Sequence, residues 1–393
     1  MHDKRMKPNN SSFYAILYVI AWIVSPPLSY GMSFRVIAII SIIILCIDSL
    51  KYAYAYQQKN LLIALGLSAY MIGIAVILEE DFNIKIGAIV LLLTGVLFDI
   101  WVSNGKVSKK RLQFLLFYTL LLYCIWNSTT LYCILHENER IMRDLTRNSD
   151  YSESFARRGI GGFGYIYSVI LMLPTAVELI RLKVRGKAFR ILNIYFVLTG
   201  FMLAYFSEYF IAMLLAILTL ILVWKKPAKS TYILVGIIIT TSGFVMETIL
   251  DTMIELIDIP EINNKLIETR NILLNDANVE DSEFGVRYER YVRDIGLIIA
   301  NPIWGTLSFK NIGKHSEFLD FFAQYGIPLG IVYVSALLHP ATVWIKRNVS
   351  IASVVLLISV IMCLLNRFPL HAAVPLCFFM PTFCRISKYN SKR

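Results

Sequence analysis

Two stretches of the chain carry side chains suited to chemistry on a phosphate-bearing substrate. Arg157 and Arg158 stand directly before the glycine-rich sequence GIGGFG, and Arg287 and Arg290 lie in a later polar stretch that leads to His315. A guanidinium group offers a planar fork that fits phosphate oxygens, and neighbouring glycines let backbone N–H groups approach an anion. Imidazole can accept a proton near neutral pH. Together these residues indicate anion binding combined with proton transfer.

Each of these residues also has a plainer interpretation. Arg157 and Arg158 are compatible with an ordinary arginine pair at a membrane boundary, and the later arginines with a solvated helix face. His315 is compatible with an ordinary surface histidine. The histidines lack HxxxH or HExxH spacing, so we predict neither a metal site nor a cofactor.

The spacing of the later stretch predicts the elements that position it. Arg287, Arg290 and Arg293 recur every third residue, which places them on one side of a helix, and Glu289 lies four residues before Arg293 and can neutralise it. The sequence Asn301–Gly305 (NPIWG) predicts a turn after that helix. Apolar residues at helical spacing predict a further amphipathic helix over 261–274, on the outer membrane surface.

The rest of the chain is dominated by long apolar blocks. Hydrophobic residues make up 57% of the 393, and the mean hydropathy is +0.62, which is typical of a polytopic membrane protein. We therefore predict an all-α membrane helix bundle of about twelve transmembrane helices. The predicted spans are 13–30, 33–50, 60–78, 84–102, 112–135, 163–181, 190–206, 209–224, 231–249, 319–338, 350–366 and 369–384.

The distribution of basic residues predicts the orientation of these spans. Lys and Arg concentrate in the termini and in short connections such as 51–59, 104–111, 182–189, 225–230 and 339–349, so these segments are predicted to be cytoplasmic. The loops at 136–162 and 250–318 are then outside. The organisation predicted is a bundle of about nine spans over 1–249, a large outer loop with short helices over 250–318, and three last spans with a cytoplasmic C-terminus over 319–393.

Several function classes are disfavoured by the same pattern. The net charge of +11 reflects basic residues at segment ends, so no nucleic-acid partner is expected. No GxxxxGK[ST] sequence is present, which argues against work driven by ATP on the cytoplasmic side. The six cysteines fall within or beside apolar blocks and are predicted to be core-filling thiols.

The later polar stretch resembles the O-antigen polymerase and ligase superfamily. The matching residues are Arg287, Arg290, the sequence Asn301–Gly305, His315 and the sequence Tyr325–Gly330 (YGIPLG). The sequence RRGIGGFG at 157–164 is similar to the polymerase branch, the Wzy-type repeat-unit polymerases. Members often have an arginine at the outer mouth of the hairpin that corresponds to 200–224, where this chain has Ser207 followed by Glu208.

The resemblance implies a membrane glycosyltransferase at the outer face of the bacterial cytoplasmic (inner) membrane. Its substrate would be a polyprenyl-diphosphate-linked oligosaccharide, whose glycan is transferred to a sugar hydroxyl of an incoming lipid-linked unit. His315 would act as base and Arg287 would stabilise the departing diphosphate, with Arg290, Arg158 and Arg157 binding it. A chain-length regulator and a flippase are possible partners beside the lipid bilayer.

Three other functions remain open on the sequence. One is a ligase that moves a finished glycan to a different acceptor. Another is a lipid-linked oligosaccharide flippase or transporter, which the placement of Asp99, Glu178, Glu208 and Glu247 near predicted helix ends argues against. The third is a non-catalytic assembly partner.

Overall fold

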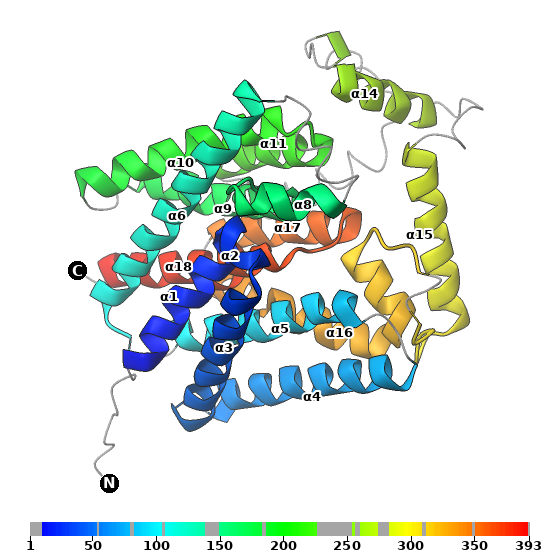
Figure 1. Ribbon diagram of the computed structural model, residues 1–393, viewed down its shortest axis with the longest axis horizontal. Helices are drawn as coiled ribbons and strands as arrows, with labels where there is room; N and C mark the ends of the chain where they lie inside the picture. Colours follow the sequence, from blue (N-terminus) through cyan, green and yellow to red (C-terminus); the bar gives the residue numbers. More distant parts are fainter. Residues whose placement is uncertain are drawn as a thin grey trace.

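The fold is all-α, as the hydrophobic pattern predicts. The computed structural model describes residues 10–52, 55–78, 82–103, 107–137, 149–182, 186–225, 254–255, 260–273, 283–308, 312–347 and 350–391. These residues form helices and their connections, and no strand occurs among them. Figure 1 shows the helices coloured along the chain.

The helices follow one another with short connections. Their bounds are α1 Asn10–Val24, α2 Pro26–Tyr30, α3 Met32–Tyr52, α4 Ala55–Ile77, α5 Phe82–Ser103, α6 Lys109–His136, α8 Ser149–Arg157, α9 Phe163–Arg181, α10 Lys187–Phe206, α11 Phe210–Lys225, α14 Pro260–Leu273, α15 Glu283–Ala300, α16 Glu317–Lys346, α17 Ser350–Leu365, the 3₁₀ turn η1 Leu370–Ala372, the π-helical turn η2 Val374–Phe379, and α18 Met380–Ser391.

Eight segments of the described chain are long and apolar enough to cross a bilayer. They are Met32–Lys51, Gln57–Ile77, Ile86–Ser103, Lys109–His136, Phe163–Arg181, Lys187–Phe206, Glu317–Lys346 and Leu370–Ser387. Each of them overlaps a span predicted from the sequence. The structure therefore has the helices of a membrane protein and suits a lipid bilayer.

The other predicted spans have different outcomes. Asn10–Val24, Ile211–Trp224 and Ser350–Leu365 are apolar helices shorter than the eight. The first predicted span, 13–30, is divided because Pro26 starts a new short helix after Ser25. The predicted span 231–249 lies outside the described residues.

The long helices run side by side and α15 runs across them. In Figure 1, α4, α5, α9, α10, α17 and α18 extend in one common direction, with the start of α1 and the end of α18 on the same side. α15 crosses the opposite side of the bundle, beside the start of α16. The later polar stretch is thus at the far side from the ends of the described chain.

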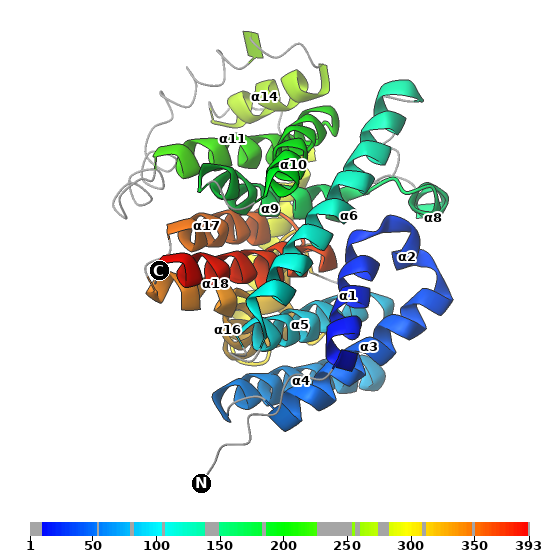
Figure 2. The ribbon, with the colours of Figure 1, turned by 90° about the vertical axis from the view of Figure 1, so that its left-hand side faces the viewer.

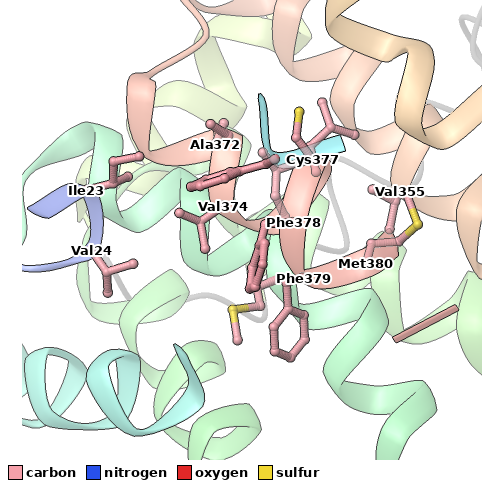
Figure 3. Packing of buried hydrophobic residues seen from close by; sticks show 14 of the residues in the cluster. Ile23, Val24, Val355, Ala372, Val374, Cys377, Phe378, Phe379 and Met380 are labelled. Atoms are coloured by element: carbon pink, nitrogen blue, oxygen red, sulfur yellow. The ribbon is translucent and has the colours of Figure 1, made fainter. Parts of the chain in front are cut away.

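The last segment of the chain forms the middle of the bundle. Val374, Cys377, Phe378 and Phe379 are buried in η2, which packs against α5, α9 and α16, and Figure 3 shows their side chains surrounded by other helices. In Figure 2, α18 continues η2 through the centre of the molecule. A helix that is apolar on all sides is expected at such a position. The five buried cysteines and the half-buried Cys46 are free thiols, as predicted.

α16 differs from the uninterrupted span predicted over 319–338. The helix begins at Glu317 and ends at Lys346, and Gly326 interrupts it with a non-helical backbone at φ +80°. Pro328 contributes to the break because it lacks the N–H that would bond to the carbonyl of Gln324 four residues earlier. The sequence YGIPLG therefore marks a break in the helix backbone.

The turn after α15 supplies the hydrogen bonds that the break removes. The Leu307 N–H donates to the freed Gln324 carbonyl at 2.8 Å, and the Thr306 N–H donates to the Ala323 carbonyl at 2.9 Å. The N–H of Ile327, the residue after Gly326, donates to the Pro302 carbonyl at 2.8 Å. Buried backbone groups need such partners, especially at membrane depth. The predicted turn at Asn301–Gly305 is confirmed, and it completes α16.

Replacing Gly326 with alanine is expected to disrupt this junction. A Cβ at Gly326 would overlap the Ile303 carbonyl, and the positive φ is unfavourable for alanine. We expect the free energy of unfolding to fall by at least roughly 2 kcal/mol, seen as a lower midpoint in thermal unfolding of the detergent-purified protein. Gly296→Ala on α15 is the control, because no atom lies within 4 Å of the added Cβ. Equal midpoints for the two variants would contradict the assignment.

Candidate functional site

The structure brings Arg290 and His315 together. Arg290 lies on α15 and His315 in the connection before α16, and the Arg290 Nη1 contacts the His315 Nε2. Because a guanidinium only donates, Nε2 acts as the acceptor in this contact and Nδ1 carries the imidazole proton. Arg287 lies three residues earlier on α15, and its side chain is outside the described residues.

The position of His315 is set by the start of α16. The Ser316 hydroxyl caps this helix by accepting from the Leu319 N–H at 3.2 Å, and it donates to the Cys363 carbonyl at 3.1 Å. The carboxylate of Glu317 accepts from the Tyr333 hydroxyl at 2.5 Å and from the Phe368 N–H at 3.2 Å. The residues next to His315 are thereby fixed to the end of α17 and to the segment that follows it.

Two buried carboxyl groups hold the residues just before His315. The Gly313 N–H donates to Asp294 Oδ1 at 2.7 Å, and the Lys314 N–H donates to Asp320 Oδ1 at 2.8 Å. Asp294 lies on α15 and is fully buried, and burial raises the pKa of its carboxyl. Sequence reasoning missed Asp294. Its position four residues after Arg290, on the same side of an amphipathic helix, is the signal that points to it.

Arg293 has a different partner from the one predicted. The sequence spacing pairs it with Glu289, whereas its Nη2 lies 3.5 Å from the Ile312 carbonyl and its charge acts on Asp294. The Glu289 side chain is exposed. The difference arises because Arg293 turns toward the connection that carries His315. The third arginine of the stripe therefore contacts the connection and not its own helix.

Arg157 and Arg158 lie in a separate part of the structure. Arg157 pairs with Glu153 on its own helix at 2.7 Å, and Arg158 contacts both carboxylate oxygens of Glu137 at the end of α6. The hydrogen bond from Arg158 lowers the pKa of Glu137. α8 packs beside α2, and Figures 1 and 2 show it apart from α15. No described contact joins these two arginines to Arg290 or His315.

The glycines after Arg158 have structural partners as well. Gly159 has a φ of +86°, and the Gly161 N–H donates to Thr130 Oγ1 on α6 at 2.9 Å. The Gly161 amide is therefore engaged within the protein. The role of Arg157 and Arg158 in diphosphate binding stays a prediction.

α15 presents an apolar face away from the bundle. Val292, Ile295 and Ile299 are spaced along one side of the helix, with exposed fractions of 50%, 47% and 73%. Trp304 continues this face at 66%. A helix of this kind that crosses the end of a helix bundle has the properties of one lying at the membrane surface, with its apolar side in lipid. We expect Arg290, on another side of α15, to lie at about the depth of lipid headgroups.

Among the described residues, no three His, Cys, Asp or Glu side chains are grouped so that they could hold a metal ion. The sequence matches no protein-family model and no curated protein.

The depth of α15 can be measured with spin labels. In a variant whose six native cysteines are replaced, labels at Ile299→Cys and Glu289→Cys are expected to differ. The first should be relaxed mainly by oxygen, which concentrates in lipid, and the second mainly by a water-soluble nickel complex, because Ile299 is on the apolar face and Glu289 is exposed to solvent. Equal nickel accessibility at both positions would contradict a membrane-surface helix.

Proposed function

We propose that this protein is a polysaccharide polymerase that uses a lipid-diphosphate-linked glycan as donor. The observation that carries the proposal is the contact between Arg290 and His315, which places a phosphate-binding cation beside a proton acceptor. The side of the bundle on which they lie and the apolar face of α15 support a substrate whose diphosphate lies at the membrane surface. The resemblance of this stretch to the O-antigen polymerase and ligase superfamily supports the reaction class.

The proposed reaction is a single glycosyl transfer. A sugar hydroxyl of the incoming lipid-linked unit attacks the anomeric carbon of the growing glycan. A new carbon–oxygen bond forms there as the bond to the diphosphate oxygen breaks. The hydroxyl proton goes to His315, and polyprenyl diphosphate leaves with the bonding electron pair. Because the diphosphate is already a good leaving group, the step needs no ATP.

Arg290 has two roles in this proposal. Negative charge grows on the departing diphosphate in the transition state, and a guanidinium placed beside it stabilises that charge. In the structure the same guanidinium contacts His315 Nε2, the nitrogen that would accept the proton. Binding of a diphosphate to Arg290 would draw the guanidinium from Nε2 and leave this nitrogen available to the sugar hydroxyl. Arg287, one turn earlier on α15, is proposed to bind the same group.

The polymerase proposal predicts a loss of long glycan chains when the site is altered. His315→Ala and Arg290→Ala are each expected to lower transfer by about 10²-fold or more, so that the native host shows single units and few long chains on gel electrophoresis. Arg347→Ala is the matched control, because Arg347 caps the other end of α16 and stacks over Trp344. It should leave the chain-length distribution unchanged.

Other distributions would identify other functions. Unaltered long chains in both site variants would contradict the proposal. Loss of the single transferred units as well, with lipid-linked units accumulating on the outer face, would identify a ligase. Lipid-linked units retained on the inner face would identify a flippase.

The diphosphate-binding role of Arg290 can be tested separately from transfer. Farnesyl diphosphate serves as a short-chain probe, with its binding to purified protein in nanodiscs measured by displacement of a fluorescent analogue. Arg290→Ala is expected to weaken binding about tenfold to a hundredfold, the loss of a charge-assisted hydrogen bond. His315→Ala and Arg347→Ala should retain binding. Equal affinity of Arg290→Ala and the unaltered protein would exclude this arginine from the diphosphate site.

A further inference from the structure

We propose that Asp294 and Asp320 form a clamp that shares one proton and positions His315. The proposal extends the function proposed above, because it concerns how the residue assigned as base is held in place. The two carboxyl groups come from α15 and α16, and the connection that carries His315 lies between these helices. Neither aspartate is assigned contact with substrate, so both are positioning residues.

The clamp acts on two consecutive backbone amides. Gly313 donates to Asp294 and Lys314 donates to Asp320, at 2.7 and 2.8 Å, and the next residue is His315. Gly313 is required for this fit, since a Cβ there would overlap Asp294 Oδ2. Lys314 has a φ of +65°, an unfavourable backbone for lysine that the hydrogen bond to Asp320 helps to maintain. These constraints fix the direction in which His315 leaves the backbone.

The remaining carboxyl oxygens indicate a shared proton. Oδ2 of Asp294 and Oδ2 of Asp320 are both buried, and no donor among the described residues hydrogen-bonds to either. The two side chains are close enough to hydrogen-bond to each other once one of them carries a proton. Two ionised carboxylates at this separation would repel each other in a buried setting. One proton removes the repulsion and satisfies the pair.

The surrounding charges do not replace this proton. Arg367 Nε lies 3.6 Å from Asp320 Oδ2, an ion pair too long for a hydrogen bond. Arg293 lowers the pKa of Asp294, but burial outweighs it and the net direction is upward. The ionisable groups on α15, the connection, α16 and the segment after α17 that lie around the pair are Arg290, Arg293, Lys314, His315, Glu317 and Arg367.

The raised pKa of Asp294 gives the sign of the pH dependence. A carboxyl whose pKa is higher in the folded protein favours folding most in its protonated form. Its contribution is complete at low pH and is lost as the pH rises through the raised pKa. Deprotonation would leave two negative charges in the clamp and loosen the connection. His315 is therefore expected to lose its fixed position toward alkaline pH.

Hydrogen exchange of the Gly313 and Lys314 amides tests the clamp without relying on glycan transfer. The full-length protein in nanodiscs is compared with its variants by mass spectrometry. Asp294→Ala and Asp320→Ala are expected to lower protection of these amides about tenfold or more, because a buried hydrogen bond to a carboxyl group is lost. Asp294→Asn should retain protection within about threefold, since the amide oxygen still accepts and its N–H replaces the shared proton. Glu289→Gln, an exposed position on α15, is the control.

The pH profile separates a shared proton from a merely structural contact. From about pH 5 to about pH 9, protection corrected for intrinsic exchange should fall in the unaltered protein and stay level in Asp294→Asn. Unchanged protection in both alanine variants would overturn the clamp. A loss in Asp294→Asn as large as in Asp294→Ala would overturn the shared proton. Lost protection with unaltered glycan length would support the clamp and contradict the role of His315 in transfer.

Discussion

The backbone break at Gly326 is the constraint on which the candidate site depends. A helix in an apolar bundle cannot leave its carbonyl and amide groups without partners, and Pro328 frees one of them. The turn Pro302–Leu307 supplies those partners and is thereby joined to α16. Since α15 ends at Ala300, directly before this turn, the same hydrogen bonds fix α15 against α16. The arginine on one helix and the histidine before the other meet because the backbone requires the junction.

The side chains around this junction add a second level of organisation. Ser316 and Glu317 attach the start of α16 to α17 and the segment after it, and Asp294 and Asp320 hold the residues before His315. Buried carboxyl groups lower stability unless they are satisfied, so their presence here needs a gain elsewhere. We attribute that gain to a fixed position for His315 at the membrane surface. The proposed transfer needs such a position because donor and acceptor are both held in lipid.

The sequence predicts the helices well and the junction only in part. Apolar blocks locate the spans over 33–50 through 190–206, because length and hydrophobicity alone determine them. The NPIWG turn and the helix that carries Arg290 also follow from local patterns. The exchange of hydrogen bonds between Thr306 and Ala323 does not, since it joins residues that no periodicity relates. Asp294 is likewise visible only once α15 is placed against α16, and Arg158 is paired with a glutamate that local spacing does not indicate.

The central claim is that this protein alone transfers a glycan from a lipid diphosphate, using Arg290 and His315. The most direct measurement reconstitutes purified protein in liposomes with lipid-linked units extracted from a host that lacks the protein. We predict a ladder of longer glycans with released polyprenyl diphosphate, formed without ATP and abolished by His315→Ala. Absence of a ladder with correctly folded protein, or an equal ladder from His315→Ala, would contradict the account.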